Sequence, residues 1–233
     1  KNKNPIDSFK NAFACDPLSA FGGVVACNFK INEKMASEIN KNFLEVILAK
    51  GFEKNSLNIL KRKKNLRIID ISEYKSKNIT RVKNFDGAFI VQNKDKIILD
   101  RKKLKCVTKL KPSKRELNEI EFTFSVSKYV KSNAIVLCNN FSTIGIGAGQ
   151  PSRFDSCKIA IQKAKKFQPQ KIKNSIAASD AFFPFTDGVE ALIKAGVKII
   201  IQPGGSIRDQ EVINCANKGK VKMLFTDIRH FNH

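Results

Sequence analysis

The sequence predicts an α/β fold, and three observations support that prediction. Short apolar runs alternate with amphipathic stretches along all 233 residues, which is typical of strands layered against helices. Gly, Pro, Ser, Asn and Asp gather where these runs stop, as turn and capping residues do. Hydrophobic residues make up 42% of the chain, which is enough to form the core of one large domain or two small ones.

The first part of the chain shows this alternation clearly. Residues 6–14 predict a short helix, because Phe9 and Phe13 share one helical face, and Asp16 with Pro17 ends it. The elements expected next are a turn and buried strand at 21–27, a helix at 32–41 capped by Asn32, a strand at 43–49, a helix at 53–63 and a strand at 66–71.

The middle of the chain is less regular. Residues 72–84 are polar and rich in Lys, so they predict a loop or linker. Residues 87–91 and 97–99 are expected to pair as a hairpin over residues 93–96.

Strands and helices alternate again in the second half. Pro112 and Ser113 carry the signals of a helix start, and that helix is expected to reach about residue 130. The remaining expectations are strands at 133–138 and 143–146 joined by a turn at 139–140, a helix at 152–166, a strand at 176–178, a helix at 187–195 ended by Gly196, a strand at 197–201, a helix at 208–218 closed by Gly219 and a strand at 221–225. Because both halves show the same rhythm, we expect two packed subdomains, residues 1–111 and 112–233.

The chain is strongly basic, with a formal net charge of +22. Its Lys residues are scattered through every segment, whereas nucleic-acid-binding proteins more often gather Arg and Lys on one face with aromatic residues between them. The densest cluster, residues 61–64, is interpreted as a solvated helix end. A general preference for Lys explains the charge more simply, and affinity for phosphate-bearing small molecules also fits it. A basic nucleic-acid-binding domain stays open as the weaker alternative.

The chain shows no sign of membrane insertion or secretion. No apolar run approaches the roughly 20 residues of a membrane helix, and residues 1–5 resemble no signal peptide. These residues also lack an initiator Met, so we expect a fragment whose N-terminal part is missing.

The six Cys residues form no C-x-x-C pair. Cys27 and Cys138 lie inside apolar runs and are interpreted as small core residues, as reduced thiols of a cytoplasmic protein would be. His230 and His233 are the only two His in the sequence, too few for a zinc signature, so no metal site is expected.

Four patches near the end of the chain concentrate the unusual residues. Residues 144–153 (IGIGAGQPSR) are one residue short of a dinucleotide fingerprint. They favour a strand with few side chains, whose backbone another group can approach closely. A helix then follows, and its Arg153 is free to contact a carboxylate or phosphate. The alternative is a Gly-rich turn with a surface Arg. Residues 180–187 (DAFFPFTD) predict a loop that is too apolar to be left in water, so it either lines the core or forms the wall of a pocket. Asp187 either caps the following helix or accepts a hydrogen bond from a heterocyclic amine.

The other two patches have similar alternatives. Residues 202–206 (QPGGS) lie between a strand and a helix, where backbone amides hold an anion or polar ring, or simply make a tight connection. Residues 229–233 (RHFNH) are either functional or a surface tail.

Taken together, these patches resemble one family. With residues 16–23 (DPLSAFGG) and 131–134 (KSNA) they match, in order, the aminoimidazole carboxamide ribonucleotide (AICAR) transformylase domain of the bifunctional purine-biosynthesis enzyme. The resemblance implies two cytidine-deaminase-like subdomains with mixed sheets flanked by helices and without zinc. It also implies a cytoplasmic homodimer with shared active sites and an N-terminal inosine monophosphate (IMP) cyclohydrolase domain in the full-length protein.

The resemblance further implies a formyltransferase, which moves a formyl group from 10-formyltetrahydrofolate to the 5-amine of AICAR. No metal, nucleic acid or membrane takes part. The enzyme has to orient both substrates and move a proton, because the amine is a poor nucleophile.

Site residues follow by position from the resemblance. It implies Asn133 at the AICAR carboxamide or amine, Glu45 near the ribose hydroxyls, Phe182 beside the imidazole, and Arg153 and Arg229 at anionic groups. The implied substrate contacts are thus Gly22, Glu45, Asn133, Arg153, Phe182 and Arg229; the folate contacts are Phe154, Asp187, Ser206, Ile207 and Phe231; and His233 closes the site.

One feature of the family is not found in this sequence. Its catalytic Lys-His pair lies in a K-H-x-N-P-C-G motif upstream of the segment matched by residues 16–23. Residues 1–5 (KNKNP) have Asn2 where the His belongs, so the catalytic residues are unknown here and Asn133 is expected to support them. A catalytically incomplete relative that only binds ligands or dimerises is the second alternative.

Overall fold

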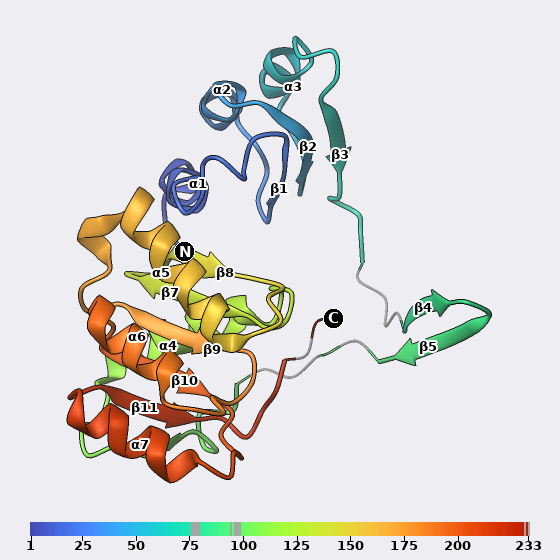
Figure 1. The fold of residues 1–233 in the computed structure, drawn as a ribbon. Helices are drawn as coiled ribbons and strands as arrows, with labels where there is room; N and C mark the ends of the chain where they lie inside the picture. Colours follow the sequence, from blue (N-terminus) through green and yellow to red (C-terminus); the bar gives the residue numbers. More distant parts are fainter. Residues whose placement is uncertain (76–79, 94, 96–98, 231, 233) are drawn as a thin grey trace. The chain divides into compact units, whose positions relative to one another are not determined.

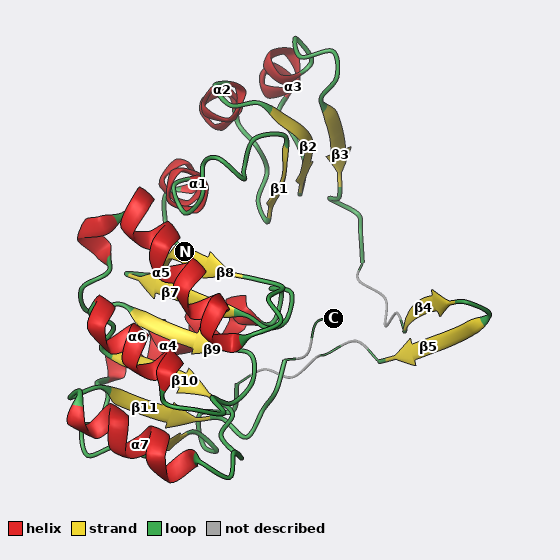
Figure 2. Cartoon of the chain, in the orientation of Figure 1, coloured by secondary structure: helices red, strands yellow, loops and turns green. Residues whose placement is uncertain are grey.

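The structure is a computed structural model, and it describes residues 1–75, 80–93, 95, 99–230 and 232 (Figure 1). It confirms a mixed α/β architecture in which sheets are flanked by helices (Figure 2). The chain forms two compact units, Pro17–Lys96 and Lys1–Asp16 with Ile97–His233. The expected division into packed subdomains at 1–111 and 112–233 stays a prediction.

A six-stranded sheet forms the centre of the larger unit. Strands β9, β10 and β11 run parallel, while β7 and β6 pair antiparallel at either side of them and β8 pairs antiparallel with β7. In spatial order the strands are β6 (Lys105–Cys106), β11 (Lys222–Phe225), β10 (Ile199–Gln202), β9 (Ile176–Ser179), β7 (Ile135–Asn139) and β8 (Ser142–Gly147).

Helices cover both faces of this sheet because its strands are apolar on both sides. Alternate residues such as Ala177, Ile200 and Met223 join one core cluster with α5 (Arg153–Phe167), α6 (Asp187–Ala195) and α7 (Asp209–Lys218). Their neighbours Ile176, Ile199 and Leu224 face the opposite way and pack against α4 (Lys114–Ser127).

Capping residues fix the ends of two of these helices as predicted. Ser113 and Glu116 form a reciprocal capping box at the start of α4. Gly196 ends α6 with a left-handed φ of 101°, a conformation that glycine adopts without penalty. Helix α1 (Pro5–Phe13) also belongs to this unit, and a short 3-10 turn, Pro169–Lys171, follows α5.

The Gly-rich end of β8 has a packing reason. A Cβ atom at Gly145 would lie 2.1 Å from the carbonyl oxygen of Ala160, and one at Gly147 would lie 1.9 Å from that of Ser156. The close approach predicted for this segment is therefore an approach by the backbone of α5, which carries Arg153 at its first turn.

The smaller unit contains a parallel three-stranded sheet in the order β1-β2-β3. Its core residues include Ile31, Met35, Ile39, Ile47 and Leu60, all nearly inaccessible to solvent. The elements are β1 (Gly23–Cys27), α2 (Glu33–Asn40), β2 (Leu44–Ala49), α3 (Lys54–Leu60) and β3 (Arg67–Asp70), close to the predicted bounds. The basic cluster at 61–64 follows the end of α3 and is largely exposed, as interpreted.

The predicted hairpin is wrong in its pairing. Strand β5 (Ala88–Gln92) is present, but it pairs with β4 (Arg81–Phe85), most of which lies in the segment predicted to be a loop. The turn between them is Asp86-Gly87, with φ of 40° and 83°. Asp-Gly is a strong signal for a two-residue hairpin turn, and the basic residues around it concealed that signal. Residues 97 and 98 of the expected partner strand lie outside the described residues.

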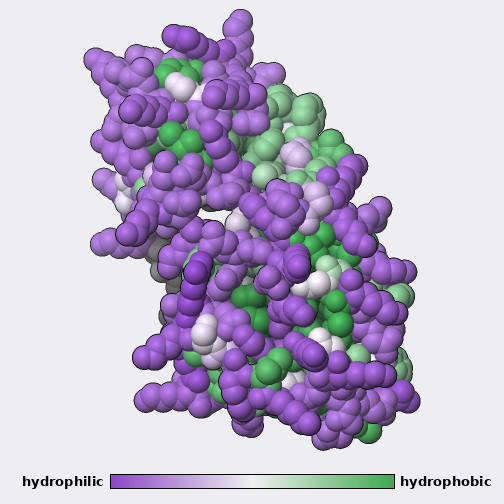
Figure 3. All heavy atoms as spheres, turned by 90° about the vertical axis from the view of Figure 1, so that its left-hand side faces the viewer, coloured by the Kyte–Doolittle hydropathy of each residue, from purple (hydrophilic) through white to green (hydrophobic). Residues whose placement is uncertain are grey.

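Hydrophilic residues dominate the face drawn in Figure 3, and apolar residues appear there as separate patches. No helix in the described part of the chain is both long and apolar enough to cross a bilayer. Cys27 and Cys138 are buried, as interpreted, and all six thiols are free. Within the described residues no group of three His, Cys, Asp or Glu is arranged to hold a metal ion.

Candidate functional site

A cleft of about 520 Å³ lies at the carboxyl edge of the parallel strands in the larger unit. Ligands bind at this edge in α/β folds because loops and helix N-termini converge there. The cleft is lined by residues from 133, 151–154, 181–187 and 229. It brings together six of the predicted site residues: Asn133, Arg153, Phe154, Phe182, Asp187 and Arg229.

A buried ion pair lies at the base of this cleft. The Arg153 guanidinium donates to Asp180 Oδ1 at 2.5 Å and to Ser179 Oγ at 2.8 Å. The side chain of Arg153 is 8% exposed and that of Asp180 is inaccessible. Arg153 is therefore not a surface residue, and the carboxylate that it meets belongs to the protein itself. Because Asp180 neutralises the charge of Arg153, the role of Arg153 at this site is that of an oriented hydrogen-bond donor.

Asn133 is held by hydrogen bonds on both ends of its side-chain amide. Its Oδ1 accepts from Arg153 Nη2 at 2.7 Å, and its Nδ2 donates to the carbonyls of Gln150 and Pro151 at 2.9 and 3.0 Å. Ser156 Oγ donates to its main-chain carbonyl at 2.8 Å. The side chain that the resemblance implies for the AICAR amine thus has a single preset orientation.

Aromatic and cationic groups form the walls of the cleft. The Arg229 guanidinium lies over the Phe182 ring at 4.9 Å, and Lys158 Nζ lies over the Phe154 ring at 4.7 Å. Such cation–π contacts hold a ring in place while leaving its other face available for a planar ligand. Phe182 is half-buried, as expected of a pocket wall rather than a core residue.

Asp187 lies at the rim, as the first residue of α6, and is exposed. Its Oδ1 accepts from the amide of Gly188 at 2.6 Å, and the helix N-terminus favours its negative charge. Below it, burial raises the pKa of the Cys157 thiol to about 12, although Arg153 opposes that rise. Cys157 is therefore a packing residue and not a nucleophile at neutral pH.

The Gly-Gly turn has a structural explanation of its own. Gly204 has a φ of 75°, and a Cβ there would lie 2.4 Å from the Phe225 ring. The amide of Gly205 donates a hydrogen bond to Asp209 Oδ2 at 2.7 Å. The carboxylate of Asp209 thus occupies the place at which an anionic ligand was expected. Ser206 Oγ accepts from the Arg208 amide, and Ile207 is fully exposed. Neither Ser206 nor Ile207 lines the cleft.

In the smaller unit, Gly22 and Glu45 lie together at the starts of β1 and β2. A Cβ at Gly22 would meet Glu45 Oε1 at 3.4 Å, and the φ of 70° at Gly22 itself favours glycine. Glu45 is 56% exposed, and its partner is Arg67 at 4.0 Å. The other two predicted residues, Phe231 and His233, lie outside the described residues.

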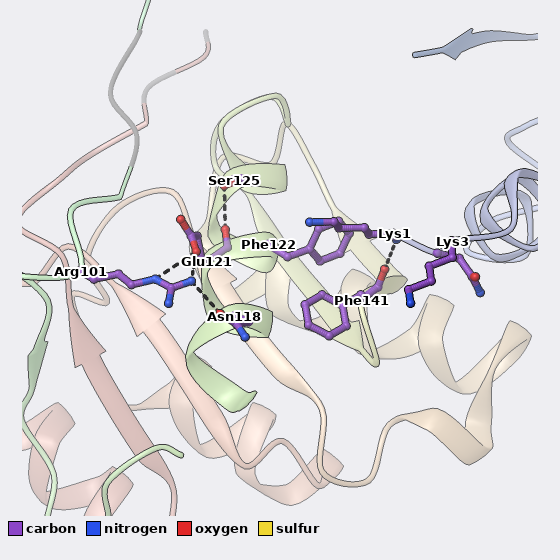
Figure 4. A pocket seen from close by; sticks show the side chains of 9 residues that line it. Lys1, Lys3, Arg101, Asn118, Glu121, Phe122, Ser125 and Phe141 are labelled. Carbon is purple, nitrogen blue, oxygen red and sulfur yellow. Dashed lines mark hydrogen bonds and ion pairs between the residues drawn. The ribbon is translucent and has the colours of Figure 1, made fainter. Parts of the chain in front are cut away.

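A larger cavity, of about 830 Å³, occurs elsewhere in the larger unit (Figure 4). It contains none of the predicted site residues. Several of its polar groups bind one another: Arg101 donates hydrogen bonds to Glu121 and Asn118, and Ser125 Oγ donates to the carbonyl of Glu121. The smaller cleft is the better candidate because it gathers six predicted site residues between aromatic walls.

Two residues, Asp180 beneath the cleft and Phe185 in its lining, were not assigned a role from the sequence, although both lie in the patch at 180–187. Asp180 could have been singled out because it directly follows the buried strand β9 in a chain with only 21 acidic residues. Phe185 is 50% exposed, and the Arg208 guanidinium lies over it at 4.9 Å. An exposed Phe between Pro184 and a helix start was a second available signal.

Comparison with known proteins shows the family of the chain. A family model described as AICARFT/IMPCHase bienzyme matches residues 1–163. Proteins called bifunctional purine biosynthesis protein PurH are 45% identical over 99% of the chain in Acetivibrio thermocellus, 46% over 99% in a Thermoanaerobacter species and 43% over 97% in Aquifex aeolicus. The chain covers 45%, 44% and 44% of these three relatives, so it spans less than half of their length. With most of its residues matched by the family model and nearly all of them by these relatives, the chain belongs to the AICARFT/IMPCHase bienzyme family.

Proposed function

We propose that this chain carries the formyl-transfer site of a purine-biosynthesis enzyme and acts on AICAR with 10-formyltetrahydrofolate as co-substrate. One observation carries the proposal: side chains from four separate segments, 133, 151–154, 181–187 and 229, line one cleft. Six of the lining residues are ones for which the resemblance to AICAR transformylases implies ligand contacts: Asn133, Arg153, Phe154, Phe182, Asp187 and Arg229.

The chemistry asks mainly for orientation. The 5-amine of AICAR attacks the formyl carbon, forming a new C–N bond, and the bond from that carbon to N10 of the folate breaks. The amine loses a proton and N10 gains one. The carboxamide beside the amine withdraws electrons from it, so holding the two reactants in an attack geometry removes a large part of the barrier.

The residues of the cleft suit this task. Phe182 offers a flat ring to the imidazole, and Arg229 supplies a cation for the ribonucleotide anion. Asn133, which Arg153 holds in place, lies beside the carboxamide or amine in this proposal. Phe154 and the exposed Asp187 form the folate side, where the carboxylate accepts from the pterin amine. Proton transfer is assigned to no residue of this sequence.

The resemblance also assigns Gly22 and Glu45 of the smaller unit to the nucleotide, and in this proposal Glu45 accepts hydrogen bonds from the ribose hydroxyls. Ser206, Ile207, Phe231 and His233 complete the folate side and close the site. The same proposal includes a homodimer with shared active sites, cytidine-deaminase-like subdomains and a cytoplasmic location. These three parts rest on the family resemblance.

The test is formyl transfer by the whole polypeptide that contains this chain. Tetrahydrofolate release is followed with AICAR and 10-formyltetrahydrofolate, and formylated AICAR is identified by mass. Arg229→Leu should lower kcat/KM by about 10- to 100-fold through the loss of one charge-assisted contact. No product from the wild type, or tight binding of random oligonucleotides that AICAR does not displace, would reject the proposal.

A further inference from the structure

We infer that Asp180 is the positioning residue of this cleft: its buried carboxylate holds Arg153 and the segment around Asn133 in the geometry that receives AICAR. This inference rests on the proposed function and adds to it a residue that does not touch the ligand. Asp180 is inaccessible and is not among the residues lining the cleft.

The carboxylate of Asp180 connects to both sides of Asn133. Its Oδ2 accepts from the hydroxyl of Ser132, and its Oδ1 accepts from the amide of Ala134 at 3.1 Å. The main-chain amide of Asp180 in turn donates to the carbonyl of Ala134 at 3.3 Å. The residues before and after Asn133 are thus fixed by one side chain.

The same carboxylate orients Asn133 through a second route. Oδ1 of Asp180 accepts from Arg153 Nη1, and Nη2 of the same guanidinium donates to Asn133 Oδ1. A guanidinium is planar, so fixing one of its nitrogens fixes the direction of the other. The oxygen of the Asn133 amide is thereby turned to Arg153 and its NH2 group to the carbonyls beyond.

The backbone of Asp180 also anchors the wall that carries Arg229. Its carbonyl accepts from the amide of His230 at 2.9 Å. Arg229 is the adjacent residue, and Phe182 lies two positions after Asp180. One residue at the end of β9 therefore connects three parts of the cleft: the Asn133 segment, Arg153 and the Phe182–Arg229 wall.

Charge explains why an aspartate suits this position. A buried guanidinium needs a full negative charge beside it, and an amide would supply only a dipole. Both Asp180 oxygens already accept hydrogen bonds, and an Asn side chain would present an NH2 group to one of those donors. The exchange Asp180→Asn therefore removes the charge and turns one acceptor into a competing donor without a change of size.

The experiment compares three variants in the whole polypeptide: Asp180→Asn, Ser132→Ala and Glu116→Gln. Glu116 also takes part in a partly buried ion pair, with Lys222 at 2.5 Å, but lies outside the cleft. AICAR binding is measured by calorimetry, formyl transfer by its kcat and KM, and folding by thermal unfolding. We expect Asp180→Asn to weaken AICAR binding by about 10- to 100-fold and to lower kcat as well.

Ser132→Ala provides a second test in case the Asp180→Asn variant does not fold. It removes one donor to the carboxylate and leaves the ion pair intact, so it should fold and weaken AICAR binding by about threefold to tenfold. Glu116→Gln should lower the unfolding temperature and leave AICAR binding unchanged. This contrast separates positioning from a general loss of stability.

Two results would overturn the inference. In one, a folded Asp180→Asn variant binds AICAR as the wild type does. In the other, Asp180→Asn does not fold and Ser132→Ala binds AICAR with wild-type affinity. Absence of AICAR binding in the wild type would instead reject the proposed function, so the two failures are distinguishable.

Discussion

The residues predicted to contact the nucleotide differ sharply between the two units. In the larger unit, Arg153 is buried and bonded to Asp180, Ser179 and Asn133. In the smaller unit, Glu45 is half exposed, and its nearest cation lies at the 4.0 Å limit of an ion pair. We expect loss of the first group, a preset frame, to damage the fold, and loss of the second, an open contact, to affect binding alone. Stability and affinity should therefore separate by unit.

The largest difference is expected from removing one arginine in each unit. Arg153→Met leaves the Asp180 carboxylate buried without its cation, which should cost about 3–5 kcal/mol of unfolding free energy. Arg67→Met removes only an exposed partner of Glu45 and should cost about 0–1 kcal/mol. Urea unfolding of both variants measures the difference. Equal losses would show that the Arg153 pair is not a structural frame.

A pair of glycine exchanges sharpens the same contrast. Gly147→Ala places a Cβ 1.9 Å from the Ser156 carbonyl, so α5 has to move and we expect a loss of about 1–3 kcal/mol or more. Gly22→Ala meets nothing closer than 3.4 Å and suffers mainly from its φ of 70°, a strain of about 1–2 kcal/mol. Only Gly22→Ala should retain the wild-type position of Arg153. Thermal unfolding ranks the two, and the reverse order would contradict the account.

The open contact should show the opposite signature. Glu45→Gln is expected to weaken nucleotide binding by about 1.5–3 kcal/mol, because it removes the charge of a hydrogen-bond acceptor. Its unfolding free energy should stay within about 0.5 kcal/mol of wild type, as for other surface substitutions. Glu73→Gln, an exposed acid in the same unit, is the matched control for both measurements. Unchanged nucleotide affinity in Glu45→Gln would remove Glu45 from the site.

The smallest effect concerns pH. Burial alone raises the pKa of Glu116, but hydrogen bonds from Lys222 and Ser113 outweigh it and hold the pKa below its ordinary value of 4.5. A lowered folded-state pKa contributes stability above pH 4.5 that is lost as the pH falls through the folded-state value. Glu116→Gln should therefore flatten the decline of unfolding temperature in acid. A variant as acid-sensitive as wild type would contradict this assignment.

Much of the fold was predictable because local signals agreed with the packing. Pro112, Ser113 and Gly196 mark helix ends by their own conformational limits, and the structure ends helices beside them. The hairpin failed for a different reason: the Asp86-Gly87 turn was obscured by surrounding charge, and the pairing of β4 with β5 depends on that turn.

Six of the predicted site residues line the cleft, but the connections between them could not be predicted. Patch composition and resemblance pointed to Arg153 and Asn133. That Asp180 neutralises Arg153, however, depends on contacts across 27 positions of the chain, which no local pattern encodes. At the Gly-Gly turn, Asp209 and Phe225 account for glycine without any ligand, and a ligand contact there stays a prediction.

Hydrogen exchange of the whole polypeptide, with and without AICAR, tests the central claim most directly. If the nucleotide occupies the cleft, AICAR should slow exchange of backbone amides in the segments around Asn133, Phe154 and Phe182. The segments around Phe122 and Phe141, in the larger cavity, should exchange at the same rate with and without AICAR. Protection confined to those two phenylalanines, with none around the cleft, would contradict the account.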